Sequence, residues 1–389
     1  MSSENKYKIL TICSWYPNKL KPTLGNFVQK HAEVIATQNE TIALAIFPDE
    51  KLKEHEITDT QKGSLREIIV YYPKKSKGFK LFRLAQNFFS HRKAFKIAYK
   101  RVLEHYGKPD LVHLNIVYPL GIWAVWLKWR YKIPFVITEN SSGFHVTSEH
   151  AYPKHILMLC KIILRNAYYI LPVSDNLKKN LQRLSPKGNY DIICNVVDEK
   201  LFTKNANSTF DQKRLIHIST GVDEIKNVSG MVRVMRELKN RQIAVALDIV
   251  SDGDIAYAKR LSEELDLNDT VFFHSTKTTA EIANMIEERD ALLMFSNYEN
   301  FPCVIAESMM CGKPIIATSV NGIPEHVTSF NGVLVEARDE HALMLAISDF
   351  VFGKLSFDAS EIRQYAEENF GYQSVGLKFL EVYRKVLHP

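Results

Sequence analysis

One stretch of the chain, residues 291–318, constrains the fold more than any other. It begins with a short apolar run, Ala291–Phe295, and ends with a second one, Pro314–Thr318, and each run predicts a buried strand. Between them, Pro302 suits the first turn of a helix and Gly312 suits the helix C-terminus. The order strand, loop, helix, strand predicts a βαβ unit whose helix begins at the carboxyl edge of a parallel sheet.

The first turn of this helix predicts an anion site. Cys303, Val304 and Ile305 are the candidates for N–H groups that lack an acceptor within the helix, and phosphate is the usual anion at such a place. Glu299 precedes the turn, and Glu307 lies about 8 Å further along the helix axis. Carboxylates do not bind a phosphate, but they accept hydrogen bonds from sugar hydroxyls. The pattern therefore predicts a nucleotide sugar, with ribose on one side of the diphosphate and a donor hexose on the other.

The run from Ser296 to Pro314 resembles a known signature. Its letters follow S-x-x-E-x-F-P-x-x-x-x-E-x-x-x-C-G-x-P over 19 positions, as in the family 4 retaining glycosyltransferases (glycosyl transferases group 1) of the GT-B fold. Weaker similarity runs along nearly the whole chain. The family usually has Gly after the first Glu, where this chain has Asn300. Asn is the next best residue at positive φ, so we expect this loop to keep its conformation.

The resemblance implies an α/β fold of two Rossmann-like domains that face each other across a cleft, with a C-terminal helix that crosses back to the first domain. It places an acceptor-binding domain at residues 1–204, a nucleotide-sugar-binding domain at 205–370 and the crossing helix at 371–389. The polar segment 205–209 predicts the linker. A chain of 389 residues is long enough for two domains that each have a core.

The resemblance also implies roles for individual residues. Glu299 would hold hydroxyls of the donor sugar, Glu307 would hold the ribose, and Lys226, expected at the start of a helix, would bind the donor phosphates. No enzymatic nucleophile, metal or further cofactor is expected. In this family the leaving phosphate is thought to take the acceptor proton. The other implied donor contacts are Gly25, Asn26, Thr220, His274, Thr276, Asn300, Phe301, Pro302, Cys303 and Val304.

Two departures from the family pattern concern catalysis. Relatives often place a His near the donor sugar where this chain has Asn140, and an Asn cannot act as a base. That role is either lost or falls to Glu139 or His145. The Arg that is usual five or six residues before Lys226 is also missing. Two alternatives to glycosyl transfer therefore stay open: epimerisation or hydrolysis of a nucleotide sugar, and a catalytically inactive scaffold that binds a nucleotide sugar.

Other motifs are expected to be structural. Asp252 and Asp254 spell the metal-binding D-x-D of the other large glycosyltransferase fold, but they stand on a tight turn where Asp side chains cap the backbone. His113, within a predicted strand, is expected to be a buried structural histidine.

Charge is distributed unevenly along the chain. Residues 1–200 carry 31 Lys and Arg against 17 Asp and Glu, whereas the remainder carries 19 against 27. Within the basic half, residues 73–103 contain ten Lys or Arg and no Asp or Glu, with Phe and Leu side chains between them. Such a stretch suits binding to an anionic membrane surface. Two alternatives are a helix that packs into the domain with its lysines in solvent, and a surface that binds nucleic acid. Of the possible partners, nucleic acid is not expected.

Cysteine usage and hydropathy bear on the compartment. The five Cys are odd in number and show no C-x-x-C spacing, which suggests reduced cytosolic thiols. The first apolar run is too short for a signal peptide, and Lys161 and Arg165 interrupt the most apolar later segment, so no span is expected. We expect a cytoplasmic enzyme, peripheral on the membrane, that transfers a hexose to a glycan or lipid-linked saccharide in surface polysaccharide or glycoconjugate biosynthesis.

Overall fold

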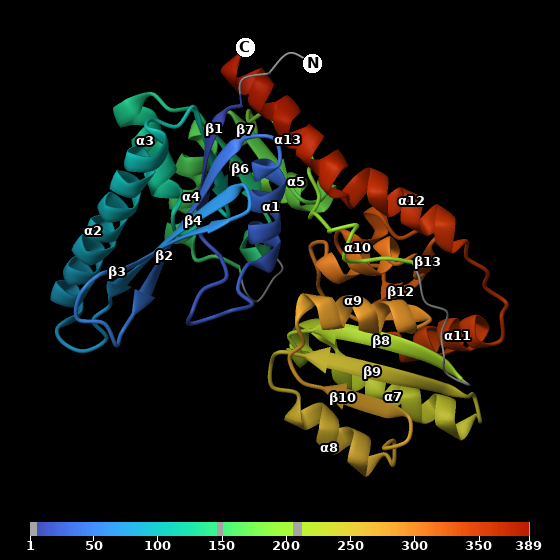
Figure 1. The fold of residues 1–389 in the computed structure, drawn as a ribbon. Helices are drawn as coiled ribbons and strands as arrows, with labels where there is room; N and C mark the ends of the chain where they lie inside the picture. The colour runs from blue at the N-terminus through green and yellow to red at the C-terminus, as the bar shows by residue number, and fades with distance from the viewer. Residues whose placement is uncertain (1–5, 146–150, 205–211, 389) are drawn as a thin grey trace. The chain divides into compact units, whose positions relative to one another are not determined.

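The computed structural model describes residues 6–145, 151–204 and 212–388, and the chain divides into two compact units. The first unit comprises Met1–Val173, Lys178–Ile193 and Val375–Pro389, and the second comprises Ser174–Leu177 and Cys194–Ser374. Each unit is a sheet covered by helices, as Figure 1 shows. The expected linker at 205–209 lies outside the described residues. The segment 194–204, which we expected in the first domain, groups with the second unit, where the Val197 N–H donates to the Phe370 carbonyl at 2.8 Å.

The sheet of the first unit has seven strands in the order β3-β4-β2-β1-β5-β6-β7. They are β1 (Lys8–Cys13), β2 (Glu40–Asp49), β3 (Glu56–Lys62), β4 (Leu65–Pro73), β5 (Leu111–Asn115), β6 (Phe135–Glu139) and β7 (Tyr169–Pro172). All these strands pair in parallel except β3, which forms an antiparallel hairpin with β4. The sequence did not indicate β3, because its polar residues lack an alternating apolar pattern.

Helices cover both faces of this first sheet. They are α1 (Asn26–Ala36), α2 (Lys80–Tyr106), α3 (Gly121–Tyr131), α4 (Lys154–Asn166), α5 (Asp175–Gln182), α13 (Tyr372–Leu387) and the short 3-10 turn η1 (Ser142–Phe144). The C-terminal helix α13 packs on this sheet through His113, whose Nδ1 lies 2.5 Å from the Tyr383 hydroxyl while its Nε2 lies 2.7 Å from Thr138 Oγ1. The return of the C-terminal helix to the first unit is confirmed, and His113 is the buried structural histidine that we expected.

The sheet of the second unit has six parallel strands in the order β10-β9-β8-β11-β12-β13. They are β8 (Lys213–Ser219), β9 (Val245–Ser251), β10 (Val271–His274), β11 (Ala291–Met294), β12 (Ile315–Thr318) and β13 (Gly332–Val335). The helices of this unit are α6 (Asp223–Lys226), α7 (Val228–Asn240), α8 (Ala256–Glu264), α9 (Thr279–Glu288), α10 (Cys303–Met310), α11 (Glu340–Val351), α12 (Ala359–Phe370) and the 3-10 turn η2 (Ile323–Glu325).

Two apolar layers hold this second sheet. On one face α7, α8 and α11 pack in one cluster of buried side chains, and on the other α9, α10 and α12 pack in a second. The expected pair of Rossmann-like α/β folds is therefore confirmed. Among the described residues, no helix has the length and apolar composition needed to cross a membrane.

Candidate functional site

Lys226 lies at the turn that follows β8. We expected it to begin a long helix, but it is the last residue of the one-turn helix α6, and α7 starts only at Val228. Asn227 separates the two helices at φ 49°, a left-handed conformation that Asn tolerates better than most residues. The Asp223 carboxylate accepts hydrogen bonds from the Ser229 N–H at 2.9 Å and the Ser229 hydroxyl at 2.6 Å, which fixes the start of α7. The break in the helix thus holds Lys226 at the sheet edge.

The structure brings Lys226 and Glu299 together. The Lys226 ammonium donates to Glu299 Oε1, and the Ser296 hydroxyl donates to the same oxygen at 2.9 Å. These residues follow β8 and β11, which are neighbouring strands, so both loops meet at the carboxyl edge of the sheet. The Glu299 residue is only 7% exposed. Because an ammonium has three N–H groups and a carboxylate has about four lone pairs, both groups can also bind a ligand.

The loop after β12 supports Glu299 from the other side. Asn321 Oδ1 lies 3.4 Å from the Glu299 N–H, and Asn321 has φ 48°. The next residue, Gly322, is required by close packing, because a Cβ there would lie 2.0 Å from the Asn300 carbonyl oxygen. Asn300 stands where the family usually has Gly, but its position does not need a positive φ: among the described residues, those with positive φ include Asn321 but not Asn300.

The helix α10 lies as the sequence predicted between β11 and β12, with one shift. Pro302 is the N-cap with φ −70° and ψ 132°, rather than a residue of the first turn, and the helix begins at Cys303. Gly312 has φ 68° just after its end. Phe301 is buried against Phe370, with ring centroids 5.3 Å apart, and so anchors the entry to the helix.

The predicted donor residues of α10 lie along its first turns. Cys303 and Val304 are the first two residues of the helix, which by helix geometry present N–H groups toward the sheet edge. Glu307 follows one turn later and is partly exposed. The dipole of this helix favours an anion at its start.

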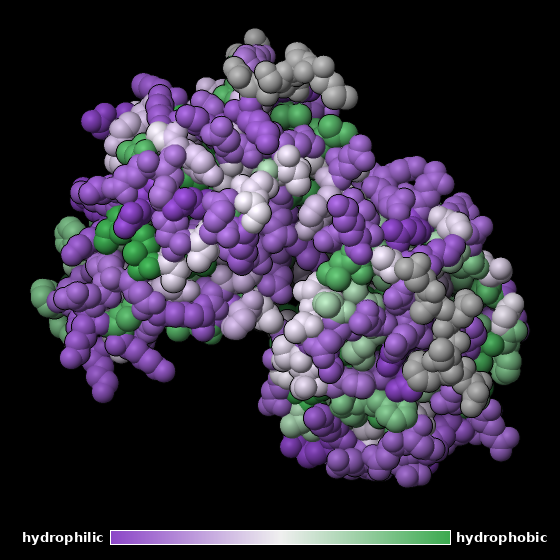
Figure 2. Space-filling view, in the orientation of Figure 1, coloured by the Kyte–Doolittle hydropathy of each residue, from purple (hydrophilic) through white to green (hydrophobic). Residues whose placement is uncertain are grey.

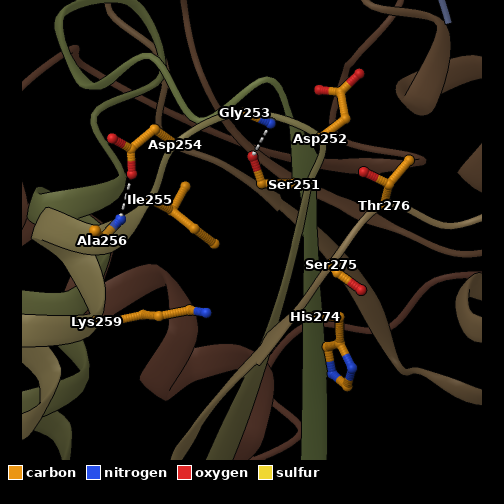
Figure 3. A pocket seen from close by; sticks show the side chains of 10 residues that line it. All are labelled: Ser251, Asp252, Gly253, Asp254, Ile255, Ala256, Lys259, His274, Ser275 and Thr276. Atoms are coloured by element: carbon orange, nitrogen blue, oxygen red, sulfur yellow. Dashed lines mark hydrogen bonds between the residues drawn. The ribbon is translucent and has the colours of Figure 1, made fainter. Parts of the chain in front are cut away.

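A pocket of about 300 Å³ lies beside this edge, at the ends of β9 and β10 (Figure 3). It is lined by Ser251, Asp252, Gly253, Asp254, Ile255, Ala256, Lys259, His274, Ser275 and Thr276. In Figure 3, Asp254 and Lys259 lie on one side of the pocket, and Ser275 and Thr276 lie on the other. Two of the predicted donor contacts, His274 and Thr276, are therefore pocket residues.

The turn that bears Asp252 and Asp254 is tightly built. Asp254 Oδ1 accepts from the Ala256 N–H at 2.9 Å, as expected for a capping residue. A Cβ at Gly253 would lie 2.0 Å from the carbonyl oxygen of Thr220, another predicted donor contact. The pocket thus adjoins the loop that leads to Lys226.

Asp248 is a buried carboxylate that we did not predict as part of the site. It contacts His274, one of the residues that line the pocket. His274 Nε2 lies 2.5 Å from Asp248 Oδ1, while Arg214 and Arg289 donate to the same carboxylate at 2.5 and 2.9 Å. Burial alone would raise the pKa of Asp248, but the hydrogen bonds from Arg214, Arg289 and His274 outweigh it and lower the pKa. The sequence could have indicated a role for Asp248, because it is an acidic residue within the mostly apolar strand β9.

In the first unit, Glu139 is not placed to react. This last residue of β6 is 0% exposed, and its carboxylate accepts the backbone N–H groups of Val117 at 2.8 Å, Asn140 at 2.9 Å and Ser141 at 2.7 Å. Burial raises the pKa of Glu139 to about 7, against the lowering effect of these hydrogen bonds. The geometry favours a role in holding the loop that carries Asn140.

The other candidates of the first unit have different surroundings. Asn140 is partly exposed, whereas His145 is buried with its Nδ1 3.2 Å from Asn180 Nδ2. Gly25 has φ 68° and caps α1, and a Cβ there would lie 2.7 Å from the Trp15 carbonyl carbon, so this turn requires glycine. Asn26 is the first residue of that helix.

Two family models match adjacent parts of the chain. The model "Glycosyltransferase Family 4" matches residues 55–201, and "Glycosyl transferases group 1" matches residues 199–369. The chain belongs to glycosyltransferase family 4. The residues of the second unit described above, from Thr220 to Glu307, all lie within the group 1 match.

The proteins that this family 4 member resembles carry several different enzyme names. It is 25% identical over 241 residues to N-acetyl-alpha-D-glucosaminyl L-malate synthase of Bacillus anthracis, a match that covers 59% of this chain and 62% of that one. Among solved structures, the sucrose-phosphate synthase of Thermosynechococcus elongatus superposes with a TM-score of 0.78 at 21% identity, over 97% of this chain and 99% of that one. The Anabaena protein Alr3699/HepE in complex with UDP-glucose has a TM-score of 0.71 at 14% identity, over 97% and 100%. Both structures share the fold.

Proposed function

We propose that this protein is a retaining hexosyltransferase that moves a sugar from a nucleoside-diphosphate sugar to a glycan or lipid-linked saccharide. The observation that carries the proposal is the pairing of Lys226 with Glu299 beside the start of α10. A cation, a helix N-terminus and a carboxylate are thereby gathered at the carboxyl edge of one parallel sheet, where open α/β folds bind their ligands. This set matches a diphosphate joined to a hydroxyl-rich group.

Each group has a distinct task in the proposed reaction. The Lys226 ammonium and the N–H groups at the start of α10 stabilise the charge that develops on the leaving diphosphate. Glu299, oriented by Ser296, accepts hydrogen bonds from hydroxyls of the donor sugar. Glu307 accepts hydrogen bonds from the ribose. A Lys226 that is already held by Glu299 needs little reorganisation when the diphosphate binds.

The chemical step needs no nucleophile from the protein. The bond between the anomeric carbon and the diphosphate oxygen breaks, and the acceptor oxygen bonds to that carbon on the same face. The acceptor proton moves to an oxygen of the leaving phosphate. The burial of Glu139 supports this route, because that carboxylate is not exposed to receive a proton from a substrate.

The pocket beside β9 and β10 is the proposed base site. Its volume of about 300 Å³ suits one nucleobase, and it adjoins the Thr220 loop, so the base and the diphosphate would lie on neighbouring strand ends. The structural relative Alr3699/HepE was solved with UDP-glucose, which favours UDP as the first nucleotide to test. The proposal includes metal independence, a cytoplasmic location and a role in surface polysaccharide or glycoconjugate biosynthesis.

Calorimetry tests the donor site directly. UDP, GDP and ADP are titrated, with and without Mg²⁺, into the wild type and into Lys226→Ala and Glu307→Ala. We expect one nucleotide to bind without Mg²⁺ and both variants to bind it at least tenfold more weakly, because each loses a ligand contact. Glu237→Ala is the matched control, since this exposed carboxylate of α7 pairs with Arg241, the C-cap residue of that helix, and should leave binding unchanged.

Product analysis separates transfer from its alternatives. Transfer requires an acceptor and yields a nucleoside diphosphate together with a glycoside of retained configuration. An altered sugar nucleotide, or free sugar, formed without any acceptor would identify an epimerase or a hydrolase. Tight nucleotide binding without turnover on any acceptor would instead identify a scaffold. Strict dependence of binding on Mg²⁺ would contradict the metal-free site.

A further inference from the structure

The first half of α2 presents its apolar side chains to solvent. Phe79, which precedes the helix, is 74% exposed, and the large apolar residues on the first turns are between 53% and 69% exposed. These are Leu81, Phe82, Leu84, Phe88 and Phe89. The second half of the helix is different, because Phe95 is buried and stacks on Trp123 with ring centroids 4.3 Å apart. The second half of the helix is therefore packed against the unit, whereas the first half exposes its apolar side chains.

The polar face of this first half contacts the preceding segment, residues 73–76. Arg83, Asn87 and Ser90 share one helix face, because they are spaced four and three residues apart. Arg83 Nη1 donates to the Ser76 carbonyl at 2.7 Å, Asn87 bonds both the N–H and the carbonyl of Lys75 at 2.8 and 3.1 Å, and the Ser90 hydroxyl donates to the Pro73 carbonyl at 3.1 Å. A surface helix normally turns its apolar face inward. The reversal leaves an apolar face in contact with water.

Positive charge surrounds this apolar face. Residues 73–103 include ten Lys or Arg and no acidic residue. Among the described residues, ion pairs engage only Lys74, Lys100 and Arg101 of these cations, at 3.4 to 3.7 Å. Figure 2 shows hydrophobic side chains among hydrophilic ones on the part of the surface where α2 runs. The surface thus combines bulky apolar groups with cations that, apart from Lys74, have no carboxylate partner among the described residues.

We propose that this surface, formed by residues 74–93, binds the anionic headgroup layer of a lipid bilayer and inserts Leu81, Phe82, Leu84, Phe88 and Phe89 below it. A bilayer supplies both an apolar layer and anionic phosphates, and lysines remain at the headgroups while aromatic rings enter the boundary. A second copy of this surface would bring two sets of cations together, so self-association through it is disfavoured. No residue of the surface belongs to the proposed donor site, so the two proposals fail or hold independently.

Vesicle co-sedimentation with the full chain tests the cations. We expect binding to phosphatidylcholine vesicles that contain phosphatidylglycerol, little binding to phosphatidylcholine alone, and weakening at high salt. The variant K74Q/K75Q/K77Q/K80Q should bind roughly 1,000-fold more weakly, given a contribution of about 1 kcal/mol for each lysine near an anionic surface. The control K108Q/K132Q/K154Q/K187Q removes four exposed lysines from elsewhere in the same unit and should bind like the wild type.

A second variant tests insertion of the apolar groups. F88S/F89S should weaken binding to anionic vesicles about tenfold or more, because it removes two inserted rings. Phe352→Ser, which changes a 62% exposed Phe of the second unit, should have no effect. Nucleotide affinity should be unchanged in every variant, and a thermal unfolding profile like that of the wild type shows that each one is folded. Equal binding by both lysine variants, unchanged binding by F88S/F89S, no binding by the wild type, or a dimer that F88S/F89S dissociates would each overturn the proposal.

Discussion

Glu139 and Glu299 both stand beyond or at the carboxyl end of a parallel strand, and both are buried, with exposed fractions of 0% and 7%. Their partners differ. Glu139 accepts three backbone N–H groups from two loops of the first unit. Glu299 accepts hydrogen bonds from two side chains, Lys226 and Ser296. Two sheets of similar topology therefore use a carboxylate at the same edge in two ways.

The difference shows what a carboxylate needs in order to serve a site. Backbone N–H groups are fixed by the fold, so a carboxylate that binds three of them has little capacity left for a ligand. A side-chain ammonium can share its N–H groups between a carboxylate and a phosphate. We therefore assign a structural task to Glu139 and a ligand-binding task to Glu299, and the following predictions test that division.

Removal of the Lys226 ammonium should have the largest effect. Lys226→Ala should lower kcat by roughly 10²- to 10³-fold, the usual consequence of losing one group that stabilises transition-state charge. The fold should persist, because Lys226 lies at the sheet edge and outside the apolar clusters. Steady-state kinetics with the donor found by calorimetry provide the measurement. In the control Lys239→Ala, which removes an ammonium paired with Asp269, kcat should stay at the wild-type value.

Replacement of each carboxylate by Gln should change different properties: stability at Glu139 and activity at Glu299. Glu139→Gln turns an amide N–H₂ toward at least one buried backbone N–H and should destabilise the first unit by about 1–3 kcal/mol. Glu299→Gln should be less destabilising, since Lys226 and Ser296 both donate to the same oxygen and an amide oxygen can still accept both hydrogen bonds, but it should reduce transfer strongly. Denaturant unfolding and donor kinetics on each variant measure both effects.

Amide hydrogen exchange localises the stability effect. In Glu139→Gln, exchange should accelerate at Val117, Asn140 and Ser141, whose N–H groups the carboxylate accepts. In Glu299→Gln, these amides should exchange as in the wild type. A Glu139→Gln protein with normal stability and lost activity would reverse our assignment.

Acid should act on the first unit through buried groups of opposite sign. Burial lowers the pKa of His113 to about 3 and that of His91 to about 4, so the unfolded chain takes up these protons first, and stability is lost as pH falls below the ordinary His value. Burial raises the pKa of Glu139 to about 7, so its contribution to stability increases as pH falls from 7 to its ordinary value. Each effect amounts to about 2 kcal/mol between neutral pH and pH ~5, so the two histidines together outweigh Glu139.

Two single variants test the contributions of His113 and Glu139 to this pH dependence separately. His113→Gln removes one of the two destabilising proton uptakes, so the first unit should lose less stability on mild acidification than the wild type. Glu139→Gln removes the opposing group, so the first unit should become less stable over the same range. Unfolding free energies measured at neutral pH and at pH ~5 test both signs. Identical slopes in the two variants would show that these groups do not titrate as described.

Much of this organisation could be predicted from the sequence, for physical reasons. The apolar runs at 291–295 and 314–318 predicted β11 and β12, and the signature from Ser296 to Pro314 located α10 and Glu299. The polar edge strand β3 gave no such signal. The pairing of Lys226 with Glu299 was also inaccessible, because their residues are 73 positions apart and only the parallel pairing of β8 with β11 brings them together. A pattern finds residue types, whereas strand order decides which residues meet.

The smallest predicted effect concerns Asn321, whose φ of 48° supports the Glu299 loop. A β-branched residue is strained in this conformation, so Asn321→Val should cost about 1–2 kcal/mol and should also remove the oxygen 3.4 Å from the Glu299 N–H. Asn321→Gly keeps the conformation and removes only the side chain, so it should change stability by less than about 1 kcal/mol. Thermal unfolding compares the two variants. If Gly and Val were equally tolerated, the left-handed turn would not be needed to place Glu299, and Lys226 together with Ser296 would suffice to orient it.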